Sequence, residues 1–590
     1  METLKDSIEL LRLAKIRYLH LHLSDFESCT FTSRAFPKFA TPGRSFTIEQ
    51  WKDLVRYADD RGVTIIPEID MPGHAGSWVG SVPEVFGTTD ANGKPKSTGV
   101  VNMASEKAYE GIDTLIGELC EIFRSSPYIH IGADEVSADG LKALPEYAVY
   151  SREHGLKLAT DGQAHELLCH FVVRVDEIVR KHGRKSIVWS GFPHRGTANV
   201  KIPKDIVIMA WDAQPQDFLA AGFQVVNCCW LPLYMVPPQT RAPTAEMIIA
   251  WNTRKFDSWE WDHAIQLPAD APIFGAQLCL WEQRYNEVVP IISSRIFALS
   301  ERTWSANTSE GFGTFEKRRE SAAKLSEKIL HPVAMSVRGT IEPQDSRFED
   351  KLEVTLSSIV PGTVIRYELD TPWETFPTAE SKIYVKPLMI GETTTVSARL
   401  FGADGKPLGG ITQRRFAKTE SIYRYCAFSP IPRHGWKEFP DFAEMKPSRE
   451  GVMGRLTTDR AQQINRAMFA GVRERGHIDV RLEDYYNPYA IELQGTLKIE
   501  TPGEYTFLFE SRDGEARLML DDQVLTSAAK LERKLTFKVG EHSFTIRHYF
   551  RAHTNDLNLQ VKSPGADSFI PFETLVVPLK NRAFSQDDQR

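Results

Sequence analysis

Up to about residue 335, short apolar runs alternate with longer stretches of helical periodicity. The helical stretches include residues 47–61, 105–123 and 161–182, and residues 1–15 form an amphipathic pattern of their own. The seven apolar runs cover residues 16–23, 63–69, 128–132, 186–191, 205–211, 223–230 and 273–281. Strands that are apolar nearly throughout are typical of a parallel sheet covered on both faces. The pattern predicts an α/β fold of the (β/α) barrel type, with a doubly wound sheet as the structural alternative.

The number of strands is unusual for a barrel. A closed barrel of this type needs eight strands, whereas the chain shows seven and opens with a helix. We therefore expect a (β/α)8-type barrel that lacks its first strand, which leaves two sheet edges unpaired. Either the native chain carries a strand and a signal peptide upstream, or runs 16–23 and 273–281 close a smaller barrel. The first explanation is favoured.

From about residue 336 the apolar positions recur every second residue between Pro, Gly and Asp turns. Residues 351–370 and 393–410 have this alternation, and residues 490–525 repeat it with several short strands. Such alternation is typical of antiparallel sandwiches. A chain of 590 residues is also too long for one core. We predict a barrel over residues 1–335, a small β-sandwich over 336–421 and a second β-sandwich over 422–590.

The composition narrows the class of protein. A hydrophobic fraction of 42% with 25% charged residues is ordinary for a globular chain. The net charge is −7 without a long basic run, so nucleic acid is not expected as a partner. The seven cysteines form no Cys-x-x-Cys motif and are expected to be buried thiols. No apolar run reaches membrane-spanning length, and the first residues lack the apolar region of a secretory signal.

Acids and aromatic residues gather where the predicted strands end, which is where barrels place their chemistry. Carboxylates can transfer protons and stabilise charge, and flat indole rings suit the apolar face of a pyranose. The pattern therefore predicts a sugar-binding, carboxylate-rich pocket. Its residues are Asp25, Glu27, Glu68, Asp70, His74, Asp134, Glu135, Trp189, Trp211, Asp212, Tyr234, Trp281 and Glu282.

The sharpest motif is Tyr-Ile-His-Ile-Gly-Ala-Asp-Glu-Val at residues 128–136. On a continuing strand, Asp134 and Glu135 would face opposite sides. Both reach one pocket only if the chain turns just past Gly132. Adjacent carboxylates also raise each other's proton affinity, which is one way to keep a general acid protonated near neutrality.

These residues carry a family resemblance. The motif at 129–136 and the Pro-Glu-Ile-Asp-Met-Pro-Gly-His-Ala block at 67–75 resemble the signature pair of glycoside hydrolase family 20, the β-N-acetylhexosaminidases. Blocks at 21–25, 189–192, 227–235 and 275–283 are similar to further family blocks in the same order. The resemblance covers roughly residues 1–310. It implies removal of terminal β-linked N-acetylhexosamine from oligosaccharides or glycoconjugates, with no cofactor and no metal. The given residues show no signal peptide and leave the location open, but the resemblance and the missing first strand together suggest a secreted or periplasmic one.

The resemblance also implies a role for each site residue. The substrate's acetamido carbonyl is the nucleophile in this family. Asp134 would orient that group, and Glu135 would be the general acid and base. His74 and Asp25 are similar to the family's support of the acid. The implied substrate-binding residues are Asp70, Trp189, Trp211, Tyr234, Trp281 and Glu282.

The chain departs from the family pattern at four places. Phe26 stands where a second Asp is usual, and Val236 stands where the family's Tyr-x-Asp has its acid. The family's Trp-x-Glu is here Trp281-Glu282-Gln283, and its first-strand arginine has no counterpart. These departures bear on sugar preference more than on the type of reaction.

The two rear segments carry weaker resemblances. Residues 362–388 are similar to the small sandwich of chitobiases, and residues 495–525 resemble a protective-antigen-like lectin module. Either segment can instead serve only to pack against the rest of the chain.

Two other functions stay open. The first is a metal-dependent amidohydrolase, because His20-x-His22 lies at a strand end, where paired histidines often bind zinc. His130 and His194 are the further ligand candidates. Against it, His20 and His22 are expected to share the inward face and to pack as polar core below the strand end. The other alternative is a catalytically impaired carbohydrate-binding protein, which the missing strand favours and the intact Asp134–Glu135 pair disfavours.

Overall fold

The computed structural model describes residues 1–579 with internal gaps. The undescribed positions are 91, 93, 137–143, 158–164, 192–198, 212–214, 237–242, 259–260, 262, 284, 306–310, 331, 341–346, 371–375, 419, 429–437, 446, 455–489, 512–513, 522, 528–529, 551–556 and 580–590. The chain divides into two compact units, Met1–Met235 with Pro243–Ser326, and Val236–Ala242 with Glu327–Arg590.

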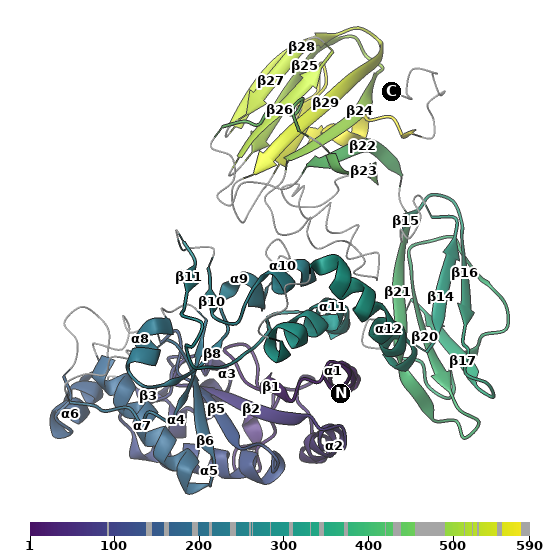
Figure 1. Ribbon diagram of the computed structural model, residues 1–590. Helices are drawn as coiled ribbons and strands as arrows, with labels where there is room; N and C mark the ends of the chain where they lie inside the picture. Colours follow the sequence, from purple (N-terminus) through teal and green to yellow (C-terminus); the bar gives the residue numbers. More distant parts are fainter. Residues whose placement is uncertain are drawn as a thin grey trace. The chain divides into compact units, whose positions relative to one another are not determined.

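The first unit is built on a parallel sheet whose strands follow the order of the chain (Figure 1). All seven apolar runs form strands of this sheet, as predicted. They are β1 (Tyr18–His22), β2 (Thr64–Met71), β5 (Tyr128–Gly132), β6 (Lys185–Trp189), β7 (Val207–Ala210), β8 (Gln224–Asn227) and β12 (Ile273–Ala276). Nearly every side chain of β2, β5, β6 and β7 is buried, which explains their continuous apolar sequences.

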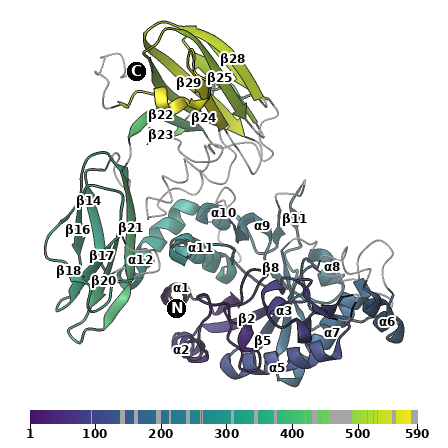
Figure 2. The ribbon, with the colours of Figure 1, turned by 180° about the vertical axis from the view of Figure 1, so that it is seen from behind.

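Helices cover the outer face of this sheet, as both ribbon views show (Figures 1 and 2). They include α1 (Glu2–Leu13), α2 (Ile48–Asp59), α5 (Glu106–Ile122) and α7 (His165–Lys181), and two long helices follow the last strand, α11 (Tyr285–Trp304) and α12 (Phe312–Leu330). The sequence marks the start of α2 through a capping box, in which Thr47 and Gln50 bond each other's backbone.

The sheet curls like part of a barrel. Among the described residues, no strand pairing joins β1 to β12, so the smaller closed barrel is not formed. Side chains nevertheless meet across the two edges, because Gln277 Nε2 lies 3.3 Å from His20 Nδ1 and the rings of His22 and Trp281 are 5.0 Å apart. The interior of the curled sheet therefore collects side chains from its first and last strands.

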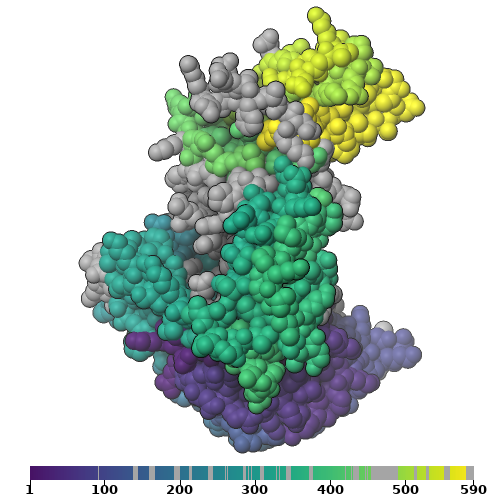
Figure 3. Space-filling model, turned by 90° about the vertical axis from the view of Figure 1, so that its right-hand side faces the viewer, coloured from purple at the N-terminus to yellow at the C-terminus, as the bar shows by residue number. Residues whose placement is uncertain are grey.

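The second unit contains two sandwiches, whose residues Figure 3 colours green to yellow. In the first, the sheets run β14-β16-β19 and β15-β21-β20-β17-β18. The strands are β14 (Ala334–Arg338), β15 (Arg347–Phe348), β16 (Leu352–Ser357), β17 (Val364–Leu369), β18 (Lys382–Ile383), β19 (Leu388–Ile390), β20 (Thr394–Phe401) and β21 (Pro407–Lys418).

The last sandwich has sheets β23-β22-β24-β29-β26-β27 and β28-β25-β30-β31. Its strands are β22 (Ser421–Phe428), β23 (Pro447–Gly454), β24 (Ala490–Ile499), β25 (Gly503–Ser511), β26 (Gly514–Leu520), β27 (Gln523–Ser527), β28 (Lys530–Phe537), β29 (Gly540–Phe550), β30 (Leu557–Lys562) and β31 (Ile570–Pro571). Each sandwich has a separate apolar core. The core residues of the first sandwich come from the segment 333–416, and those of the last sandwich come from the segment 422–576. The three-domain boundaries at 335 and 421 stay a prediction.

All seven cysteines lie among the described residues and are thiols outside any disulfide, and five of them are buried, as their spacing predicts. Within the described part of the chain, no helix is long and apolar enough to cross a membrane.

Candidate active site

The site lies where β5 ends. The strand stops at Gly132, and Gly132, Ala133 and Glu135 have φ angles of 73°, 77° and 44°. These left-handed conformations turn the chain just past Gly132, which is the turn that the sequence requires if Asp134 and Glu135 are to share a pocket. The Glu135 side chain is 58% exposed, whereas Asp134 is half-buried.

Two glycines allow neighbouring strands to approach this turn. A Cβ atom at Gly132 would lie 1.6 Å from Asp70 Oδ1, and one at Gly191, just after β6, would lie 2.5 Å from Asp134 Cα. Any larger residue at either position would collide with a predicted site residue. Glycine is required here by contact, and at Gly132 also by its positive φ.

A chain of hydrogen bonds supports Glu135. His74 Nδ1 lies 2.9 Å from Asp25 Oδ1, and His74 Nε2 lies 3.3 Å from Glu135 Oε2. The hydrogen bonds with Asp25 and Glu135 raise the pKa of His74 to about 11, so the ring is an imidazolium at neutral pH. The same bond from His74 lowers the pKa of Glu135.

The sequence predicts a raised pKa for the general acid Glu135, but in the structure the carboxylates with raised pKa are Asp134 and Asp70. Burial, and then the charge of Glu68, raise the pKa of Asp134 to about 6. Asp70 on β2 is fully buried, and burial together with the charges of Asp134 and Glu68 raises its pKa well above the usual range. The expected rise in the proton affinity of Glu135 is therefore not seen, because the contact with His74 lowers its pKa by more than burial and the charge of Asp25 raise it.

Aromatic side chains from four later segments lie side by side in a group that we call the aromatic chamber. The ring centroids are 6.0 Å apart for Trp189 and Trp281, 6.5 Å for Tyr234 and Trp281, and 6.2 Å for Trp211 and Tyr234. Trp230 also belongs here, at 4.6 Å from Tyr234. The sequence reasoning missed Trp230, although it precedes Tyr234 by four residues in the same block.

Three polar atoms at the chamber and beside it are buried without a hydrogen-bond partner in the described part of the chain. They are Asp134 Oδ1, Trp211 Nε1 and Trp281 Nε1. One acceptor and two donors of this kind fit a ligand that offers both an N–H group and oxygen acceptors.

Two further positions singled out in the sequence, Glu282 and Phe26, are exposed. Glu282 is exposed with φ +57°, and no described hydrogen bond or ion pair joins it to the other predicted residues. Phe26 is 63% exposed, and its backbone N–H donates to Asp25 Oδ1 at 2.5 Å. The structure thus brings together the carboxylates and the aromatic rings, but leaves Glu282 outside that group.

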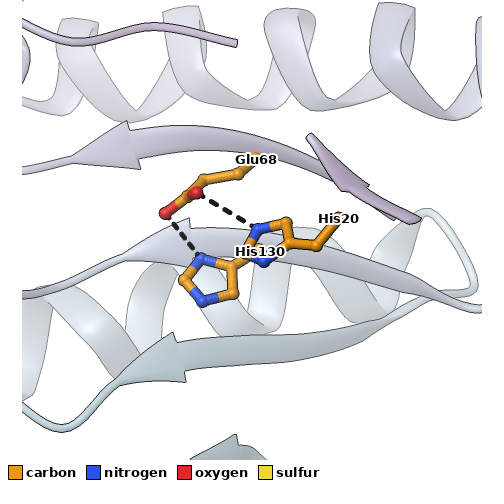
Figure 4. Close-up of side chains that lie close together, drawn as sticks. All are labelled: His20, Glu68 and His130. Atoms are coloured by element: carbon orange, nitrogen blue, oxygen red, sulfur yellow. Dashed lines mark ion pairs between the residues drawn. The ribbon is translucent and has the colours of Figure 1, made fainter. Parts of the chain in front are cut away.

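Glu68, which the prediction placed only at a strand end, is the centre of a buried cluster. The register of β1, β2 and β5 sets His22, Glu68 and His130 side by side. Glu68 Oε2 lies 2.7 Å from His22 Nδ1. It also lies 3.1 Å from His20 Nε2, and Glu68 Oε1 lies 2.9 Å from His130 Nδ1 (Figure 4). Trp189 Nε1 donates to Glu68 Oε1 at 2.7 Å.

His20 packs inside the sheet as expected, but His22 does not lie below the strand end. It is the last residue of β1, and its Nε2 is 3.3 Å from Asp25 Oδ2. That part of the prediction is wrong, because β1 stops at His22 and the chain turns toward the site within three residues.

A metal fits this cluster poorly, although His20, Glu68 and His130 are close enough to form a ligand set. Zinc bonds of ~2.0–2.1 Å at tetrahedral angles hold ligand atoms about 3.4 Å apart. The contacts of Glu68 are 2.7–3.1 Å, which are the lengths of direct hydrogen bonds and ion pairs. Glu68 Oε1 also accepts a hydrogen bond from the Trp189 N–H, and this donor lies where a cation would have to approach that oxygen. His194, the other proposed ligand, lies outside the described residues.

Comparison with known proteins agrees with the resemblance seen in the sequence. A family model described as "Glycosyl hydrolase family 20, catalytic domain" matches residues 1–307. A beta-hexosaminidase of Porphyromonas gingivalis is 27% identical over 450 residues, covering 69% of this chain and 54% of the relative. Beta-hexosaminidase subunit alpha of Bos taurus is 24% identical over 324 residues, covering 52% and 58%. The chain thus spans about half the length of these curated relatives.

Among solved structures, the beta-N-acetylhexosaminidase of Bacteroides fragilis matches with a TM-score of 0.46 and 22% identity. That match covers 55% of this chain and 68% of the other.

Proposed function

Since the chain belongs to glycosyl hydrolase family 20, we propose that it hydrolyses terminal β-linked N-acetylhexosamine residues by a substrate-assisted, retaining mechanism. The observation that supports the proposal is the left-handed turn after β5 that carries Asp134 and Glu135. Asp134 is also close enough to Tyr234 of the aromatic chamber for its charge to help raise the pKa of that tyrosine. The substrates are N-acetylhexosamine-containing oligosaccharides or glycoconjugates.

In the first step the acetamido carbonyl oxygen attacks C1, and the bond from C1 to the glycosidic oxygen breaks. The N–H of the acetamido group donates to Asp134 Oδ1, a buried acceptor that has no hydrogen-bond partner among the described residues. Ionised Asp134 then stabilises the positive charge of the oxazolinium ring. Trp189, Trp211 and Trp281 enclose the acetamido methyl, and the Tyr234 hydroxyl donates to its carbonyl oxygen.

Glu135 protonates the departing oxygen. In the free protein the proton resides on His74, whose Nε2 is 3.3 Å from Glu135 Oε2. A bound sugar would cover the exposed Glu135 carboxyl, and loss of water raises the pKa of a carboxyl group. The shared proton then passes to Glu135 and on to the leaving group. In the second step Glu135 takes a proton from water, and the water oxygen adds to C1. The bond from C1 to the acetamido oxygen breaks, which opens the oxazolinium ring and gives a product of retained configuration.

The first test compares p-nitrophenyl N-acetylglucosaminide with p-nitrophenyl glucoside, which lacks the acetamido group, each with and without a chelator. We expect hydrolysis of the first substrate only, unaffected by the chelator. Equal hydrolysis of both substrates would overturn substrate assistance. Loss of activity with the chelator would favour the metal-dependent amidohydrolase, and binding without turnover the impaired carbohydrate-binding protein.

The second test assigns the acid. Glu135→Gln should abolish turnover of alkyl or sugar glycosides but spare substrates with very acidic leaving groups, because a good leaving group needs little protonation. Glu118→Gln is the control, since Glu118 is a buried glutamate of α5 that accepts hydrogen bonds from the backbone N–H groups of Arg34 and Ala35. Equal losses on both substrate types would remove Glu135 from the acid's role.

A further inference from the structure

The support of Glu135 continues beyond Asp25 into the interior of the sheet. Glu68 Oε2 to His22 Nδ1 is 2.7 Å, and His22 Nε2 to Asp25 Oδ2 is 3.3 Å. With the two contacts of His74, carboxylates and imidazoles alternate without a break from the fully buried Glu68 to the exposed Glu135. We call these five residues the relay: Glu68, His22, Asp25, His74 and Glu135.

We propose that Glu68 and His22 are positioning residues, which fix the general acid through Asp25 and His74 and at the same time fix Trp189. The inference rests on the proposed function. It gives Glu68 two tasks, one on each oxygen: Oε2 holds His22, and Oε1 accepts the Trp189 N–H at 2.7 Å. Through one carboxylate, the acid is connected to a ring of the chamber that would hold the acetamido group.

The geometry of the two histidines supports this assignment. Each ring uses both nitrogens, and each nitrogen faces a carboxylate oxygen. A ring held at both ends cannot rotate without breaking a charged hydrogen bond, so Asp25 is fixed from both sides. Charge-assisted bonds of this kind are roughly twice as strong as neutral ones. The relay is therefore rigid between Glu68 and His74.

The charges along the relay agree with the geometry. Burial by itself lowers the pKa of His22, but the charge of Glu68 and the bonds from Asp25 and Glu68 outweigh burial and raise it. Burial likewise raises the pKa of Asp25, but the bonds from His22 and His74 reverse this and lower it. Both rings are thus cations between anions, which is the state that makes each contact strongest.

Other ionisable groups face the inner end of the relay. His20 on β1 and His130 on β5 contact Glu68, and burial lowers the pKa of His130 to about 4, so that ring is neutral. Asp70 on β2 faces His22. On the outer side, Asp134 feels the charge of Glu68, which helps to raise its pKa to about 6. Removing the charge of Glu68 should therefore lower the pKa of Asp134.

The test uses the full chain and two pairs of variants. His22→Gln breaks the relay without touching Trp189, and Glu68→Gln breaks both connections. Glu68→Asp keeps the charge, and Glu118→Gln controls for loss of a buried carboxylate elsewhere. Rates are measured against pH on an alkyl N-acetylglucosaminide, which needs the acid, and on the p-nitrophenyl glycoside, which needs it less.

We expect His22→Gln to lower kcat on the alkyl glycoside by about tenfold or more, and to have a much smaller effect on the nitrophenyl glycoside. In a Glu135→Gln background, His22→Gln should cause no further loss, because a group that acts only through Glu135 has nothing left to act on. Glu68→Gln should in addition raise KM and move the acid limb of the pH profile to lower pH, whereas Glu68→Asp should leave that limb in place.

Two outcomes overturn the inference. The first is that His22→Gln lowers kcat on both substrates equally and that its effect adds fully to that of Glu135→Gln. The second is that Glu68→Gln behaves as Glu118→Gln does. If Glu68→Gln does not fold, the inference is decided by the double-mutant cycle of His22→Gln with Glu135→Gln and by the pH profile of Glu68→Asp. An inactive wild-type protein, or a Glu135→Gln variant without leaving-group dependence, contradicts the proposed function instead, so the two failures are distinguishable.

Discussion

Replacing Gly191 with alanine should misplace the catalytic turn while leaving the fold intact. The new methyl carbon would lie 2.5 Å from Asp134 Cα and 2.8 Å from Asp134 Cβ. Carbon atoms pack at ~3.5–4.0 Å, so the turn that carries Asp134 and Glu135 must move by about 1 Å. Misplacement of this size can reduce a rate by about 10²-fold, or about 2.7 kcal/mol in the barrier. Added bulk in a packed region costs about 1–3 kcal/mol of stability, which a typical domain tolerates.

The assay is kcat/KM on p-nitrophenyl N-acetylglucosaminide, with a thermal melt of each variant. Gly275→Ala is the matched control, because Gly275 lies on β12 of the same sheet and a Cβ there meets nothing within 4 Å. We expect Gly275→Ala to retain wild-type activity and Gly191→Ala to lose about two orders of magnitude. A folded Gly191→Ala protein with normal kcat/KM would refute the claim that the position of this turn controls catalysis.

Two further predictions concern pH and the last sandwich. In the proposed mechanism Asp134 must be ionised, and its pKa is raised to about 6, so kcat/KM should fall as the pH drops below about 6. Asp134→Asn should lower kcat/KM by several orders of magnitude and remove this acid limb, and a flat pH profile in the wild type would contradict the assignment. Removing residues 422–590 should leave activity on small soluble substrates intact and reduce it on polymeric glycans, since that sandwich has a separate core; unfolding of the first unit on truncation would show that the sandwich is structural.

The strands of the first unit could be predicted from sequence because local composition determines them. Each apolar run lies between polar helical stretches, and burial on both faces leaves no alternation to misinterpret. The turn after Gly132 also followed from sequence, since two adjacent carboxylates can share a pocket only if the strand ends there. The arrangement of the sheet edges could not be predicted, because it depends on contacts such as Gln277 with His20, which are 257 residues apart.

The inner part of the relay, Glu68 with His22, and the charge of Glu135 could not be predicted from the sequence for a different reason. Alternation places His20 and His22 on one face of β1 and Glu68 and Asp70 on one face of β2. It does not say which of them meet, because that depends on the register between strands. The register pairs His22 with Glu68, and Glu68 with His130. The state of Glu135 depends likewise on His74, which is 61 positions away in the chain but 3.3 Å away in space.

Backbone strain gathers at the candidate site. Among the described residues, seven other than glycine have positive φ, and three of these, His74, Ala133 and Glu135, lie at the candidate site. A left-handed conformation costs such a residue roughly 1–2 kcal/mol, so it persists only where the surroundings enforce it. Here the enforcing contacts are visible: the relay holds His74 and Glu135 from one side, and the close approach of Gly191 confines Asp134 from the other. In the proposed mechanism this conformation is fixed before the sugar binds, so the two carboxylates need no rearrangement. That is the condition under which electrostatic stabilisation of a transition state is most effective.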